Sequence, residues 1–256
     1  MILVLKGVNE ISLNIDKCAV VNFSRKRPDN TSYNIGEKEV TQQHNYKYLG
    51  VVLNEKLSWD QNVEHTRKKA GRSLEFVMRN LKGTDSKIKA RAYETLIRPI
   101  LEYGTKVGDP YRQGLIGDLE MIQRKAARRV LNQYHNYNPE GEYRSVSKMI
   151  TDIGWKSLES RRELDRLCGM HKAVNRHTGW EEIADRLAFS GRIGRGDNSK
   201  KLTINHVSTD VGKYSFINRT AKSWNKLDDT VVLSKSCRLF RARASQWIEN
   251  RVSKQV

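Results

Sequence analysis

The chain has 256 residues, with 47 Lys or Arg against 29 Asp or Glu, which gives a formal net charge of +18. A mean hydropathy of −0.70 is polar for a compact enzyme, but a hydrophobic content of 38% excludes a chain that is disordered throughout. So basic a surface attracts phosphate backbones and releases their counterions, which favours a nucleic-acid partner over an anionic membrane surface or no partner. The length allows one or two domains.

The cysteine pattern predicts neither disulfides nor a metal centre. Cys18, Cys168 and Cys237 are far apart and odd in number. His171 and His177 lie six residues apart, and no Cys and His pair has the spacing of a zinc motif, so we predict no zinc site. No stretch is long enough to span a membrane or to serve as a signal peptide, which predicts an intracellular protein of the nucleus or cytoplasm.

Residues 1–57 are predicted to form a small β region. Apolar and polar residues alternate over 11–15, which is typical of a strand. Residues 33–40 predict a short hairpin that leads into the aromatic and apolar stretch Tyr46–Leu53. This stretch pivots on Gly50, a residue type that permits a tight turn.

Residues 58–132 are predicted to form a bundle of amphipathic helices. Ser58 is expected to cap a first helix that runs from about Trp59 to Lys82. A second helix follows to about Arg98, where Pro99 ends or kinks it. Its inward residues are predicted to be Ile88, Ala92, Leu96 and Ile97. A third helix is predicted over Leu115–Leu131.

Residues 133–256 are predicted to form a helical carboxy-terminal region behind a polar linker over 132–143. The predicted helices are Trp155–Asn175, Glu181–Leu187, Ser215–Leu227 and Ser236–Val252. A flexible basic loop is expected over 191–201. The predicted fold class is therefore mainly α with a small β portion.

Several segments, taken in their order and spacing, resemble one protein family. They are Leu13–Cys18 with Phe23–Arg25, Tyr46–Val51 with Leu57–Trp59, Arg98–Gly104 with Asp109–Pro110, Leu119–Arg128, and Tyr214–Thr220 with Trp224–Leu227. Together they resemble the carboxy-terminal part of the reverse transcriptase of LINE-type, non-LTR retrotransposons, in the jockey-like branch. The resemblance covers nearly the whole chain, and implies a palm edge with a primer-grip hairpin, a helical thumb and a helical tail.

The chain departs from this family at its catalytic centre. The family's polymerases hold Mg²⁺ with one Asp early in the palm and an Asp-Asp pair, and no counterpart precedes Lys17. The resemblance therefore implies a fragment that binds nucleic acid and is inactive alone, with no cofactor of its own. Gly108 also stands where the family's thumb has Trp.

The resemblance assigns roles to residues of the β region. Lys17 corresponds to a lysine that would protonate the leaving group in the intact enzyme; otherwise it is an exposed strand lysine. Tyr48, Leu49 and Gly50 would form the primer grip, with an ordinary hairpin as the alternative. Leu49 is expected in the core in both cases.

Two rows of cations are the candidate phosphate contacts. They are Arg67, Lys68, Lys69 and Arg72 on the first helix, and Arg124, Lys125, Arg128 and Arg129 on the third. Cations spaced along a helix suit the backbone of an RNA template–DNA primer duplex or of RNA, although such rows are often only solvated faces. The alternatives are a stand-alone helical RNA- or DNA-binding module and a non-functional relic.

Overall fold

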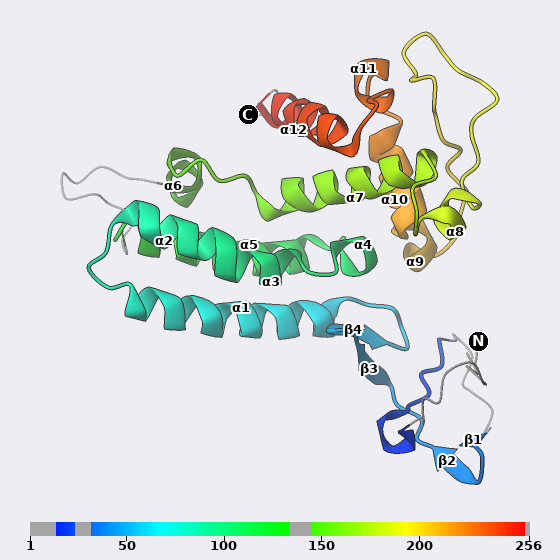
Figure 1. The fold of residues 1–256 in the computed structure, drawn as a ribbon, viewed down its shortest axis with the longest axis horizontal. Helices are drawn as coiled ribbons and strands as arrows, with labels where there is room; N and C mark the ends of the chain where they lie inside the picture. The colour runs from blue at the N-terminus through cyan, green and yellow to red at the C-terminus, as the bar shows by residue number, and fades with distance from the viewer. Residues whose placement is uncertain (1–13, 24–31, 134–144, 254–256) are drawn as a thin grey trace. The chain divides into compact units, whose positions relative to one another are not determined.

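The computed structural model describes residues 14–23, 32–133 and 145–253 (Figure 1). The chain divides into two units, Met1–Ser58 and Trp59–Val256. The first contains two short antiparallel hairpins, and the second is helical. The predicted fold class, mainly α with a small β portion, is confirmed.

Both predicted hairpins form in the first unit. Strands β1 (Tyr33–Ile35) and β2 (Lys38–Val40) pair around a turn at Gly36, whose φ is 63°. Strands β3 (Asn45–Tyr48) and β4 (Val51–Asn54) pair in the register Tyr48↔Val51. The second hairpin is thus centred on Leu49 and Gly50.

The predicted strand before these hairpins is wrong where the structure describes it. Ile15–Lys17 forms a short 3₁₀ helix, η1, instead of a strand. The Asn14 side chain accepts a hydrogen bond from the Asp16 amide at 3.2 Å, a local contact that competes with strand pairing. Residues 11–13 of the predicted strand, and most of the predicted linker over 132–143, lie outside the described residues.

Helices α1 (Asp60–Asn80) and α5 (Gln113–Val130) lie side by side and carry the first hydrophobic core of the second unit. Val63, Leu74, Leu119 and Ile122 are buried there. The other helical segments around this core are α2 (Ser86–Ala92), η2 (Tyr93–Ile97), α3 (Arg98–Glu102), α4 (Thr105–Gly108) and α6 (Val146–Asp152). The predicted packing of these helices into a bundle is confirmed.

Ser58 does not cap α1 as predicted. The amide of Ser58 donates to Asn54 Oδ1 at 2.9 Å, and its hydroxyl accepts from Asn54 Nδ2 at 2.8 Å. Trp59 is the N-cap residue, without a side-chain hydrogen bond. The Ser58 hydroxyl is thus directed to the end of β4, and the helix begins one residue later than predicted.

The predicted inward face of the second helix is confirmed at Ile97, half-buried at Ala92, and wrong at Ile88 and Leu96. Lys89, Tyr93 and Ile97 are buried, whereas Ile88 and Leu96 are exposed. The Tyr93 hydroxyl donates to Gln123 Oε1 at 2.9 Å, and burial raises the pKa of Tyr93. The hydrogen-bonded pair of Tyr93 and Gln123 therefore lies on the buried side of this helix, where the sequence pattern predicted only apolar side chains.

Pro99 does not end the helical path. The π-helical segment η2 leads directly into α3, where a proline stands in the first turn. Proline is tolerated in the first turn of an α-helix, and the change from η2 to α3 at Arg98 gives Pro99 that position.

The second core lies among α7 (Leu158–Val174), α10 (Phe216–Trp224) and α12 (Cys237–Ser253). Trp224 and Phe240 are its largest buried side chains. The short helices α8 (Glu181–Ala184), α9 (Asp210–Lys213) and α11 (Asp229–Val232) adjoin it. Because Leu158 belongs to the first core and Leu167 to the second, α7 joins the two.

The predicted flexible loop over 191–201 is anchored at its second half. Asn198 is buried and donates hydrogen bonds to the carbonyl oxygens of Trp224 and Leu227, at 2.9 and 3.1 Å.

Among the residues that the structure describes, none of the helices combines the length and apolar composition needed to cross a membrane.

Candidate nucleic-acid interface

The tip of the β3–β4 hairpin presents large side chains to solvent. Leu49 and Gly50 have φ values of 44° and 83°, the pair of left-handed residues typical of a two-residue hairpin turn. Tyr48 is 60% exposed and Leu49 is 73% exposed. The prediction that Leu49 lies in the core is wrong, because a residue at the turn has no sheet face to pack against.

Leu49 occupies a backbone conformation that disfavours leucine, by about 1–2 kcal/mol. We expect Leu49→Asn to stabilise the hairpin by about 1 kcal/mol, since Asn tolerates this region and suits the first turn position. Slower hydrogen exchange of the β3 and β4 amides, followed by NMR, measures the gain. Gly50→Ala is the control and should speed exchange; unchanged exchange in Leu49→Asn would refute the assigned strain.

Lys17 lies in the same unit as the hairpin. Its side chain is exposed, and its carbonyl oxygen accepts a hydrogen bond from the Tyr46 hydroxyl at 2.9 Å. The backbone of η1 is therefore attached to β3 two residues before Tyr48. The leaving-group role of Lys17 stays a prediction.

The cations of α1 divide between different sides of the helix. Glu75 forms an ion pair of 2.5 Å with Arg129 of α5, so its side of α1 faces α5. Arg72 and Lys68 precede Glu75 by three and seven residues, and helical geometry places them on that side. Lys69 lies farther round the helix, and Arg67 is half-buried.

The cations of α5 divide in the same way. Lys125 is exposed and lies one turn before Arg129, next to the contact with α1. Arg128 and Arg129 are half-buried, and Arg128 lies one turn after both Arg124 and Lys125, at the border of this side. Arg124 instead lines a groove of about 1270 Å³ beside Glu120 and other acidic residues. We name the set that follows the line between α1 and α5 the seam cations: Lys68, Arg72, Lys125, Arg128 and Arg129.

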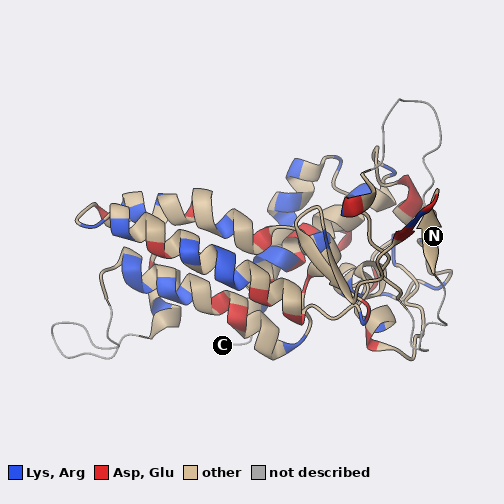
Figure 2. Cartoon of the chain, turned by 90° about the horizontal axis from the view of Figure 1, so that it is seen from below, with Lys and Arg blue, Asp and Glu red and all other residues tan. Residues whose placement is uncertain are grey.

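Acidic residues neutralise part of this set. Lys68 forms an ion pair of 2.6 Å with Glu64, and its hydrogen bond and charge lower the pKa of Glu64. Arg72 and Lys125 are exposed, and no acidic side chain in the described part of the chain pairs with them. Figure 2 shows Lys and Arg along the neighbouring helices, with fewer Asp and Glu between them. The seam therefore keeps net positive charge.

A buried carboxylate connects the end of α4 to α7 and α10. Asp109, directly after α4, forms ion pairs with Arg162 at 2.9 Å, with Arg219 at 3.1 Å and with Arg166. The first and last of these arginines belong to α7, and Arg219 belongs to α10. Burial and the charge of Arg219 lower the pKa of Arg166 to about 9. Sequence reasoning did not assign this cluster, although Asp109 and Arg219 both lie in the family-like segments.

Comparison with known proteins relates the chain to retrotransposon polymerases. Over 125 residues it is 26% identical to the RNA-directed DNA polymerase from mobile element jockey of Drosophila funebris. The aligned part is 47% of this chain and 13% of that polymerase, so the chain spans a small part of its relative. No family model and no solved structure matches the chain. The similarity supports a reverse-transcriptase-like relationship.

Proposed function

We propose that the chain corresponds to the carboxy-terminal part of a LINE-type, non-LTR reverse transcriptase, and that its seam cations hold the backbone of a template–primer duplex. The observation that carries the proposal is the pair Arg72 and Lys125, which are exposed on neighbouring helices and have no acidic partner among the side chains that the structure describes. Cations repeated along adjacent helices fit a row of phosphates and carry no sequence readout. The similarity to the jockey polymerase supports the coarser part of this proposal, a relationship to retrotransposon polymerases.

The β3–β4 hairpin is our candidate for contact with the primer end. Its tip presents Tyr48 and Leu49, and Leu49 has a strained backbone. Strain of this kind persists where the surrounding structure enforces it, and it clusters at ligand-binding sites. On this proposal, Leu49→Asn stabilises the hairpin and at the same time weakens contact with the primer end.

Polymerisation is assigned to residues other than these 256. The family's metal-binding aspartates have no counterpart in the segments that resemble the family, so Mg²⁺ and the reaction belong to the palm of an intact enzyme. The described residues contribute positioning of the duplex and no chemical step.

A stand-alone nucleic-acid-binding module is the second candidate function. It is favoured by one feature, the two hydrophobic cores that the helical unit builds from its own residues. A module of this kind would bind RNA or DNA without a primer end. The two candidates therefore differ in the ligand that binds most tightly.

Binding of a fluorescent RNA–DNA hybrid across a salt series tests the proposal. With up to five seam cations on phosphates, we expect log K to fall against log salt with a slope of about −3 to −5. A flat response would contradict both candidate functions. A hybrid with a recessed primer end should bind more tightly than blunt duplex or single-stranded RNA, and equal binding would favour the module.

The same preparation serves for a primer-extension assay with Mg²⁺ and deoxynucleotides. No extension is expected, because the metal-binding aspartates are missing from the segments that resemble the family. Synthesis by the purified 256-residue chain would overturn the division between binding and chemistry.

A further inference from the structure

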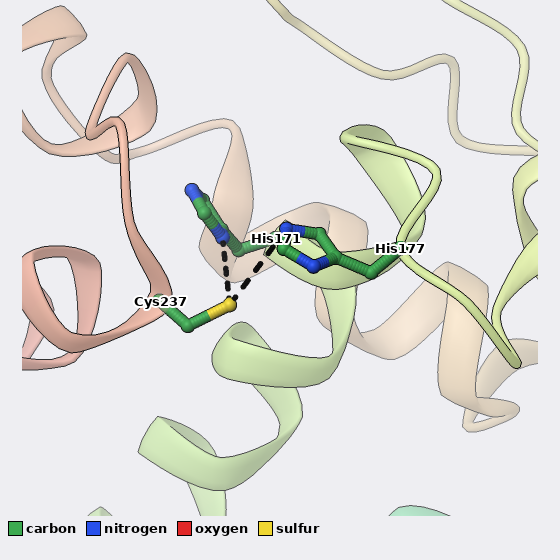
Figure 3. A group of neighbouring side chains, drawn as sticks. All are labelled: His171, His177 and Cys237. Atoms are coloured by element: carbon green, nitrogen blue, oxygen red, sulfur yellow. Dashed lines mark hydrogen bonds between the residues drawn. The ribbon is translucent and has the colours of Figure 1, made fainter.

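Three side chains with nitrogen or sulfur donors meet at one edge of the second core. They are His171 near the end of α7, His177 in the turn that follows, and Cys237 at the first residue of α12 (Figure 3). Cys237 Sγ lies 3.8 Å from His171 Nδ1 and 3.9 Å from His177 Nε2. The donor atoms of all three residues lie within 4.8 Å of one another. Sequence spacing predicted no such group, because only folding brings Cys237 to the two histidines.

These distances are close to those of a tetrahedral metal centre. Zn²⁺ binds thiolate at about 2.3 Å and imidazole at about 2.0 Å, which puts sulfur and nitrogen about 3.5 Å apart. The two sulfur–nitrogen distances here are only slightly longer, so a small contraction would bring the donors to an ion. Two imidazoles and one thiolate also form a donor set that suits Zn²⁺.

The inner histidine is already oriented as a ligand. His171 Nε2 lies 3.0 Å from the carbonyl oxygen of Ser234, which can only accept a hydrogen bond. Nε2 therefore carries the proton, and the lone pair of Nδ1 points toward Cys237 Sγ. His171 is buried, with 1% of the residue exposed, and its ring stacks on Phe240 with ring centroids 4.3 Å apart.

Access from solvent is open on the other side of the cluster. His177 is exposed and Cys237 is half-buried, so an ion can enter without disturbing the core. Cys237 begins a helix, and a helix N-terminus favours a negatively charged ligand such as thiolate. No fourth His, Cys, Asp or Glu joins the group among the described residues, which leaves one position for water.

We propose that His171, His177 and Cys237 bind one Zn²⁺ ion, with water as the fourth ligand. The ion would connect the end of α7 to the start of α12, segments separated by 60 residues in the sequence. A cross-link over so long a loop stabilises the folded carboxy-terminal region. The site is independent of nucleic-acid binding, so the two proposals fail or stand separately.

Titration of the tag-free 256-residue chain with Co²⁺ tests the site, since a thiolate ligand adds a charge-transfer band to the spectrum. We expect one ion per chain, displaced by Zn²⁺, and loss of the band in Cys237→Ser. Zn²⁺ at about 100 times its Kd should raise Tm by roughly 5–10 °C. His177→Ala should abolish that shift, and its exposed position should leave the fold intact.

The matched control is Cys18→Ser, which removes a partly exposed thiol from the other unit and should leave the band unchanged. The proposal is overturned if the native chain gives no thiolate band, or if the band persists in Cys237→Ser. Equal metal content in His177→Ala and the native chain would also overturn it. In that case the three side chains form only hydrogen bonds.

Discussion

Asp109→Asn is expected to lower the free energy of unfolding of the helical unit by about 3–5 kcal/mol, because it removes one partner from a buried ion-pair cluster. The side chains of Arg162 and Asp109 are only 2% and 5% exposed. Arg166 and Arg219 share the same carboxylate. Asparagine keeps the shape of the side chain but leaves three guanidinium groups without their counter-charge. Urea denaturation followed by far-UV circular dichroism measures the loss.

Asp185→Asn is the matched control. It breaks the ion pair with Arg176, at 2.9 Å, in which both side chains are exposed. Exposed pairs contribute at most about 1 kcal/mol, so the control should be nearly neutral. Equal effects of the two substitutions would show that Asp109 does not stabilise the unit.

The charge argument can be separated from a packing argument by a second substitution. Arg166→Met removes a guanidinium whose pKa burial and Arg219 lower to about 9, so its charge is the least favourable of the three. In the Asp109→Asn background this change should restore part of the stability, because replacing a buried charge with an apolar side chain is often neutral or stabilising. A double-mutant cycle measures the coupling, and additive effects would contradict it.

The elements predicted well from sequence are those whose signal is local. The spacing of Val63, Ala70, Leu74 and Met78 predicts the buried face of α1, since each residue is four or seven positions from the next. Gly50, in the aromatic and apolar stretch Tyr46–Leu53, likewise predicts the turn of the second hairpin. Backbone geometry within a few residues determines both features.

The elements missed depend on contacts between distant residues. Arg162 and Arg166 are charged residues on a helix, so periodicity alone predicts that they face solvent; Asp109 buries them from more than fifty positions away. The spacing of Cys237 and His171 in the sequence likewise does not indicate that the two residues come together in the fold. Gly108, a departure from the family pattern, is explained by Trp59: a Cβ at position 108 would lie 3.1 Å from the indole ring.

The assignment of the two cation rows to a nucleic-acid interface stays a prediction, and the structure divides each row between sides of its helix. Sequence reasoning grouped Arg124 with Lys125, but α5 directs them to different sides, and Arg124 lines the groove beside Glu120. Adjacent positions on a helix point about 100° apart, so Arg124 and Lys125 diverge, whereas Arg128 lies within one turn of both. Which of those faces lies next to α1 is decided by Ile122, which lies against Gly71, and by the Glu75–Arg129 pair.

The double substitution Arg72→Gln with Lys125→Gln is expected to weaken binding of an RNA–DNA hybrid roughly 10- to 100-fold at low salt, since each charged contact is worth about 1–1.5 kcal/mol. It should also reduce the salt slope by about two units, one for each phosphate that the variant no longer neutralises. Both side chains are exposed, and glutamine favours helix, so the fold should be unaffected. Fluorescence anisotropy across a salt series measures affinity and slope together.

Lys222→Gln with Lys226→Gln removes the same amount of charge from exposed positions in α10 and just after it, away from the seam. If binding follows net charge alone, both double variants will weaken it equally and shift the slope by the same amount. If the seam tracks the phosphate backbone, only the Arg72 and Lys125 pair will change the slope, because counterion release depends on the phosphates that the protein neutralises. Equal slopes in the two variants would therefore reject the seam as the interface, even if the protein binds nucleic acid.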